Sequence, residues 1–115
     1  MCNRMVVQLT HEELDRAFRA LADGTRRDIL RRTLIEASSV SDLAAAYEIS
    51  FAAVQKHVAV LERAGLVRKT PSGRARLVAA IPDQLARVRA CLEQFEALWR
   101  HRLTGLDAVL SEPEE

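Results

Sequence analysis

The apolar residues of this chain change their spacing at Gly65. Before this glycine they recur every three or four positions, which is the period of an amphipathic helix. After it they alternate as far as Ile81, which is the period of a strand, and from Pro82 the helical spacing returns and continues to about Leu110. The sequence therefore predicts a mainly α-helical fold with one small β-hairpin near its middle.

The length and composition fit one globular domain. The chain has 115 residues, of which 49% are hydrophobic and 29% charged, so it can bury one core. No apolar run is long enough to span a bilayer, and the N-terminus lacks the apolar segment of a signal peptide. We expect a cytoplasmic protein without membrane contact, with one domain over residues 10–110 and flexible tails at 1–9 and 111–115.

Four helices are predicted before Gly65, and small polar residues mark where they begin. Thr10 and Glu13 have the spacing of a capping box, which starts the first helix. A second helix runs from about Thr25 to Leu34, Ser39 caps a short third, and Ser50 caps a fourth over Phe51–Ala64. A short helix, a tight turn and a second helix make a helix-turn-helix.

The hairpin predicted at Val67–Ile81, here called the wing, carries positive charge. Arg74 and Arg76 alternate with Ala75, so we expect both arginines on one side of its tip. Arginines on a wing typically contact phosphates or a narrow minor groove. The arginines at 26, 27, 31 and 32 recur at helical spacing, and we expect them to form a solvent-exposed surface.

The helix Phe51–Ala64 has two distinct faces. Three apolar residues recur at i, i+4 and i+7 and should pack against the preceding helices: Val54, Val58 and Leu61. The opposite face is suited to a DNA groove and carries Phe51, Ala52, Gln55 and Lys56. A glutamine amide can pair with an adenine edge, and a lysine can reach a guanine or a phosphate. The helix N-terminus with the Ser50 hydroxyl suits a phosphate oxygen.

The chain resembles the ArsR/SmtB family of winged-helix repressors. The resemblance is carried by residues 18–27 (FRALADGTRR), 41–44 (SDLA), 50–67 (SFAAVQKHVAVLERAGLV) and the basic hairpin, and it extends from about Leu14 to Leu110. It implies a homodimer that binds an inverted-repeat operator in double-stranded DNA and blocks transcription. It also implies base-reading places for Phe51, Ala52, Gln55 and Lys56. His57 is interpreted as a packing and hydrogen-bonding residue.

The last helix predicts a dimer. Its apolar residues step by three or four positions over a length that short helices of one domain cannot cover: Leu85, Val88, Leu92, Phe95, Trp99, Leu103, Leu106 and Leu110. Because the family pairs its first and last helices, Leu14 and Phe18 are expected to join the interface. We therefore expect dimerisation helices at both ends of the winged helix-turn-helix.

No cofactor is predicted. The short third helix lacks the Cys and His residues that metal-sensing relatives carry there, so the chain resembles a subgroup without the usual metal sites. Cys2 and Cys91 are expected to be reduced thiols. A repressor that responds to redox change, persulfide or metal through these two cysteines remains an alternative, and the effector is left open.

The sequence fits two other functional classes, an enzyme and a protein-binding module, less well. The three histidines have no neighbouring nucleophile motif, and the four glycines form no phosphate loop, so an enzyme is not expected. A winged helix used only for protein–protein contact is the second alternative. Gln55, Lys56 and the arginines of the wing favour DNA over that alternative.

Overall fold

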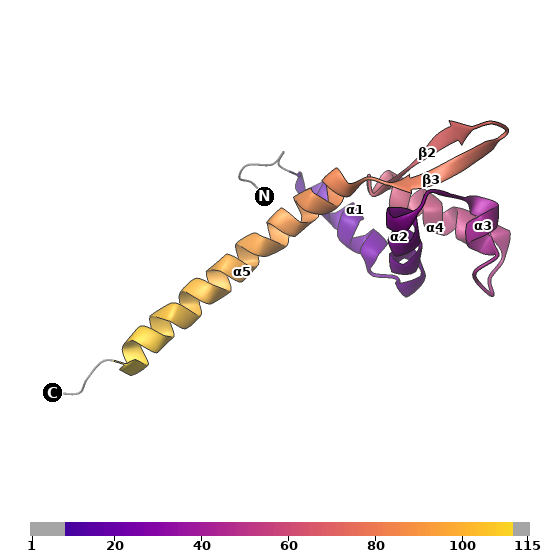
Figure 1. Ribbon diagram of the computed structural model, residues 1–115. Helices are drawn as coiled ribbons and strands as arrows, with labels where there is room; N and C mark the ends of the chain where they lie inside the picture. Colours follow the sequence, from indigo (N-terminus) through magenta and orange to yellow (C-terminus); the bar gives the residue numbers. More distant parts are fainter. Residues whose placement is uncertain (1–8, 112–115) are drawn as a thin grey trace.

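The computed structural model describes residues 9–111, with side chains as far as residue 105. Its elements are, in chain order, α1 (His11–Leu21), α2 (Gly24–Ile35), β1 (Ser38–Ser39), α3 (Val40–Ala44), α4 (Phe51–Arg63), β2 (Val67–Ser72), β3 (Ala75–Ala80) and α5 (Pro82–Ser111). This order confirms the predicted mainly α fold with a hairpin. Figure 1 shows α1 to α4 gathered at the base of the β2–β3 hairpin, while α5 runs away in the opposite direction.

Side chains cap the helices where the sequence predicted. The Thr10 hydroxyl accepts a hydrogen bond from the Glu13 amide at 3.1 Å, and the Glu13 carboxylate accepts one from the Thr10 amide at 3.0 Å. The bond from the Thr10 backbone is the main reason that the pKa of Glu13 is lowered. Ser39 and Ser50 cap α3 and α4 in the same way. Asp23 caps α2, where its carboxylate accepts a hydrogen bond from the Arg26 amide.

The sheet has a third strand that the sequence analysis did not predict. Its order is β1-β3-β2, with Ser38 opposite Val78 and Ser39 opposite Leu77. Two residues are too few to show an alternating pattern, and the pairing partner lies far along the chain. The predicted two-stranded hairpin is therefore one part of a three-stranded antiparallel sheet.

The hairpin has a fixed register and a tight turn. Val67 lies opposite Ala80 and Ser72 opposite Ala75, which leaves Gly73 and Arg74 as the turn. Gly73 has a φ of 62°, the left-handed conformation that a two-residue hairpin turn needs and that glycine adopts without strain. Arg74 thus lies in the turn itself rather than in a strand.

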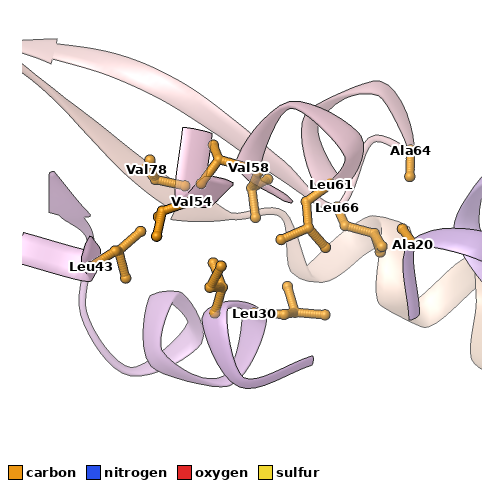
Figure 2. Packing of buried hydrophobic residues seen from close by; sticks show 11 residues of the cluster. Ala20, Leu30, Leu43, Val54, Val58, Leu61, Ala64, Leu66 and Val78 are labelled. Atoms are coloured by element: carbon orange, nitrogen blue, oxygen red, sulfur yellow. The ribbon is translucent and has the colours of Figure 1, made fainter. Parts of the chain in front are cut away.

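The main core lies between α2, α4 and the sheet (Figure 2). Val54, Val58 and Leu61 are fully buried, which confirms the predicted inner face of α4. They pack with Leu30 of α2, Leu43 of α3, Val78 of β3, and Leu66, which directly precedes β2. Because these contacts hold α4 by one face only, its other face remains exposed.

A second, smaller cluster joins α1 to the start of α5. It consists of Leu9, Leu14, Ala17, Val88 and Cys91. Leu9 was assigned to the flexible N-terminal tail, but only 2% of its surface is exposed, so Leu9 belongs to the packed domain. The remaining tail residues, 1–8 and 112–115, lie outside the described part of the chain. Among the described helices, none is both long and apolar enough to cross a membrane.

Candidate nucleic-acid interface

A groove of about 390 Å³ lies between the N-terminal end of α4 and the tip of the wing. It is lined by Ser39, Val40, Ser41, Phe51, Gln55, Lys69, Arg74, Ala75 and Arg76. Four of the predicted DNA-binding residues therefore meet in one place, two from α4 and two from the wing. The sequence predicted these two pairs separately, and the fold brings them together.

The other predicted residues of α4 lie outside the lining of the groove. Ser50, Ala52 and Lys56 are exposed but do not line it. The Ser50 oxygen accepts a hydrogen bond from the Ala53 amide at 3.1 Å, and its O–H can still donate to another group. Phe51 is 47% exposed, which is unusual for a large aromatic side chain that has no role outside the core.

The register of the hairpin explains why Arg76 lies in the groove. Residues directly opposite each other share a face, so Arg76 and Pro71 lie on the same face as Lys69 and Val78. Val78 is buried, so this is the face that the sheet turns toward the helices. Arg76 lies further toward the tip, beyond the core, where the same face overhangs the end of α4.

Lys69, Ser39 and Ser41 line the groove but were not predicted as site residues. Lys69 is one of the cations of the wing, but only the register of the hairpin shows that it shares a face with Arg76. Arg68 is also a cation of the wing, and its position opposite Ala79 puts it on the other face of the hairpin. Ser39 and Ser41 enter through β1 and α3, and no local pattern indicated that these elements adjoin the wing.

The charged residues that line the groove are all positive. Lys69, Arg74 and Arg76 contribute cations, and no Asp or Glu belongs to the lining. A groove with cations on one wall and the exposed N-terminal end of a helix on the other favours an anionic ligand. Phosphate oxygens of a nucleic acid have this character.

A hydrogen-bonded network fixes the turn that precedes α4. The Tyr47 hydroxyl donates to the Asp28 carboxylate at 2.5 Å, and Arg31 and Arg32 form ion pairs with the same carboxylate. The Tyr47 hydroxyl first, and then the two arginines, hold the pKa of Asp28 well below its usual range. Burial, followed by this hydrogen bond, raises the pKa of Tyr47 to about 12.

The arginine cluster of α2 is not simply a solvated surface. Arg31 and Arg32 are exposed and paired with Asp28. Arg26 is partly buried and donates to backbone carbonyls of α1, which corrects the prediction for this residue. His57 packs against it with 22% of its side chain exposed, and the predicted packing and hydrogen-bonding role of His57 is confirmed.

The outer part of α5 has an exposed apolar surface, here called the α5 stripe. Its residues are Leu92, Phe95, Leu98, Trp99 and Leu103, of which Phe95, Leu98 and Trp99 are each about 60% exposed or more. Phe18 of α1 is also exposed. Leu98 was not among the predicted interface residues, and Leu106 lies beyond the described side chains.

Leu14 does not fit its predicted place in a dimer interface. Only 7% of its surface is exposed, because it packs within the protomer against the first turns of α5. The helical spacing showed that Leu14 and Phe18 share a face, but it could not show that α5 of the same chain covers one of them.

Cys91 is buried and disulfide-bonded. The expectation of a reduced thiol at this position is therefore wrong in this structure, since it was drawn from an inferred compartment and not from the surroundings of the sulfur. Cys2 lies outside the described residues. Among the described side chains, those of residues 9–105, no three His, Cys, Asp or Glu lie close enough together to hold a metal ion.

The sequence matches known regulatory proteins. Residues 21–70, which run from the end of α1 into the wing, match a family described as a helix-turn-helix domain. Over 96 residues the chain is 41% identical to the HTH-type transcriptional regulator Rv2034 of Mycobacterium tuberculosis. That alignment covers 84% of this chain and 87% of the relative.

Solved structures agree with this match. An ArsR-like transcriptional regulator from Rhodococcus sp. RHA1 superposes with a TM-score of 0.77 at 32% identity, over 90% of this chain and 97% of that one. The homodimeric winged helix-turn-helix DNA-binding domain of Mb0332 from Mycobacterium bovis superposes with a TM-score of 0.61 at 23% identity, over 81% and 90%. The second likeness supports the fold alone.

Proposed function

Because the chain belongs to the ArsR family of winged helix-turn-helix transcriptional regulators, we propose that it is a single-domain homodimeric repressor that acts on double-stranded DNA in the cytoplasm. The observation that carries this proposal is the groove in which Phe51 and Gln55 of α4 face Arg74 and Arg76 of the wing. The repressor needs no bound metal or cofactor and catalyses no reaction.

In this proposal, α4 enters the major groove and the wing follows the backbone beside it. Gln55 and Lys56 read base edges, Phe51 contacts a thymine methyl group, and the small side chain of Ala52 allows close approach. The Ser50 hydroxyl donates to a phosphate at the N-terminal end of the helix. Arg74 and Arg76 contact phosphates or the minor groove.

The dimer forms through the α5 stripe together with Phe18. Apolar side chains of this size, exposed in a row, are typical of a surface that another protein covers. Mb0332, which shares this fold, is homodimeric, and we propose the same assembly for this chain. Two copies related by a two-fold axis place their recognition helices about 34 Å apart, one turn of DNA, and so fit an inverted repeat. A dimer bound across a promoter would exclude RNA polymerase.

The recognition residues can be tested by binding to a duplex that the wild-type protein selects from a random-sequence pool. We expect the double variant Gln55→Ala/Lys56→Ala to bind this duplex at least about a hundredfold more weakly, since each base contact is worth about 1–3 kcal/mol. Arg89→Ala, which removes one exposed charge from α5, serves as the control and should bind normally. Wild-type affinity in the double variant would disprove the assignment of the recognition helix.

The wing is tested by the salt dependence of the same binding. Arg74→Ala should reduce the slope of log affinity against log salt by about 2, since the dimer loses one phosphate contact in each half-site. Failure of the wild-type protein to select any duplex, together with capture of a protein partner by the wing, would favour the protein–protein alternative.

A thiol-responsive form of this repressor is favoured by one observation. Cys91 is disulfide-bonded. It lies on α5 where this helix packs against α1, immediately before the α5 stripe begins at Leu92. Dithiothreitol would convert the disulfide to two thiols and become a cyclic disulfide itself. Affinity for the selected duplex should then differ severalfold between oxidised and reduced wild-type protein, and should not differ in Cys91→Ser. Equal affinity of the two wild-type forms would rule this form out.

A further inference from the structure

The Arg26 guanidinium connects three helices. Its Nε donates to the carbonyl of Ala20 at 2.8 Å, and its Nη2 donates to the carbonyl of Arg19 at 2.9 Å. Both carbonyls belong to the last turn of α1, where the Arg19 carbonyl also accepts a hydrogen bond from the Ala22 amide at 3.3 Å. Its third nitrogen, Nη1, lies 3.3 Å from Nδ1 of His57 on α4. One side chain of α2 thus ties the end of α1 to the middle of α4.

The contact with His57 requires one form of the imidazole ring. A guanidinium can only donate hydrogen bonds, so Nδ1 must accept and the proton must reside on Nε2. Asp23 completes the group, because its Oδ2 accepts from the Arg26 amide at 3.0 Å and lies 3.9 Å from the same Nδ1. The hydrogen bond from the Arg26 amide is the main reason that the pKa of Asp23 is lowered, so this carboxylate stays charged beside the guanidinium.

The helices joined in this way have different tasks in the proposed repressor. Helix α1 carries Phe18 at the expected dimer surface, while α4 carries the reading residues. His57 directly follows Gln55 and Lys56 in α4, so a bond at His57 acts on the segment that must fit the DNA groove. In a dimer, the angle between α1 and α4 sets how the two recognition helices are oriented toward each other.

We propose that Arg26, acting through His57, is a positioning residue that fixes the orientation of the recognition helix relative to the dimer surface. This inference rests on the proposed function, since it assigns Arg26 no contact with DNA. Its effect is on specific binding, which needs both half-sites in register, and not on the general attraction to phosphates.

The chain supplies a matched control for Arg26 in its neighbour. Arg27 also caps the end of α1, donating from Nη1 to the carbonyl of Leu21 at 2.7 Å. This hydrogen bond joins α2 to α1 and does not reach α4. We expect Arg26→Ala to weaken binding to the selected duplex about tenfold, the equivalent of one lost charge-assisted hydrogen bond. Binding to a scrambled duplex and the salt slope should match those of Arg27→Ala, which loses the same charge.

Variants of His57 test the second half of the contact. Leucine at this position cannot accept a hydrogen bond, so His57→Leu should reproduce the tenfold loss, whereas His57→Gln keeps an acceptor and should restore most of the affinity. Combining Arg26→Ala with His57→Leu should add little to either single change, because both remove the same interaction. Full additivity of the two losses would contradict the proposal.

Amide hydrogen exchange tests the connection without DNA. Arg26→Ala should speed exchange both in the last turn of α1 and around His57 in α4, whereas Arg27→Ala should affect α1 alone. Equal effects of the two arginine variants on exchange and on duplex binding would reduce Arg26 to a helix cap and overturn the inference. If the wild-type protein selected no duplex, the proposed function would fail, and the exchange measurement would still decide whether the connection exists.

Discussion

Helices α4 and α5 are both amphipathic, but they differ in where their apolar faces are covered. The apolar face of α4 is completely buried within the protomer, at Val54, Val58 and Leu61. Helix α5 buries its first turns, at Val88 and Cys91, and its large apolar residues from Leu92 to Leu103 are exposed. A helix that is held by one face can offer the other to DNA. A helix whose apolar face is uncovered needs a second protein surface.

The largest effect should come from removing the packing of α4. Leu61→Ala should lower the free energy of unfolding by about 3 kcal/mol, since it leaves a cavity at a fully buried position. Urea denaturation followed by circular dichroism measures this loss. Leu34→Ala makes the same change at a half-exposed site on α2 and should cost about 0.5 kcal/mol or less. Equal costs for the two variants would mean that α4 is not anchored as described.

The next largest effect should appear on α5. Trp99→Ala should weaken the dimer by about 2 kcal/mol, or roughly thirtyfold, because a large aromatic side chain is lost from the centre of the expected interface. Sedimentation equilibrium measures the dissociation constant, and circular dichroism confirms that the helices persist. Ile35→Ala removes an exposed apolar side chain from α2, outside the α5 stripe, and serves as the control. A dimer unaffected by Trp99→Ala would place the interface elsewhere.

A smaller effect is expected at the turn that leads into α4. Tyr47→Phe removes the hydrogen bond to the Asp28 carboxylate and should cost about 1 kcal/mol of stability at neutral pH, after allowance for the partial exposure of Asp28. Thermal unfolding at matched protein concentration measures the difference.

The same variant has a defined dependence on pH. The Tyr47 hydroxyl and the two arginines lower the pKa of Asp28, so their contribution to stability is complete above the unfolded-state pKa. It is lost as the pH falls from about 5 toward the folded-state pKa. The stability difference between wild type and Tyr47→Phe should therefore shrink in acid. A difference that stays constant even as the pH approaches the folded-state pKa of Asp28 would show that Asp28 is not its source.

The smallest effect should come from the ion pair between Arg89 and Glu93. Both side chains are largely exposed, so solvent screens their attraction. Arg89→Gln should leave the unfolding midpoint and the dimer constant unchanged within error. A measurable loss of the dimer would extend the interface from the α5 stripe to the polar side of the helix.

The sequence predicted best the features that depend on neighbouring residues. The caps at Thr10, Ser39 and Ser50 and the buried face of α4 follow from local spacing, and the structure confirms them. Features that depend on partners far along the chain were missed. The strand Ser38–Ser39 has no pattern of its own, and the groove position of Lys69 follows only from the register of the hairpin.

Two further differences have a related cause. Arg26 has the same helical spacing as the exposed arginines around it, and only the nearby end of α1 gives it carbonyls to bind. Leu14 lies one turn before Phe18 on α1, but α5 of the same chain covers only the first of them. Periodicity shows which face of a helix is apolar, and it does not show which element will cover that face.

Ser39 belongs to two elements at once. Its backbone pairs with Leu77 of the wing, and its hydroxyl caps α3, the first helix of the helix-turn-helix. Ser39 thereby adds a backbone link between the wing and the helix-turn-helix to the core contacts that already join them, and a tilt of one should carry the other with it. In the proposed complex, the distance between the DNA contacts of α4 and those of the wing is then fixed. DNA whose backbone spacing does not match this distance must bend or twist to be bound. The protein would therefore select its sites by the stiffness of the DNA as well as by base sequence.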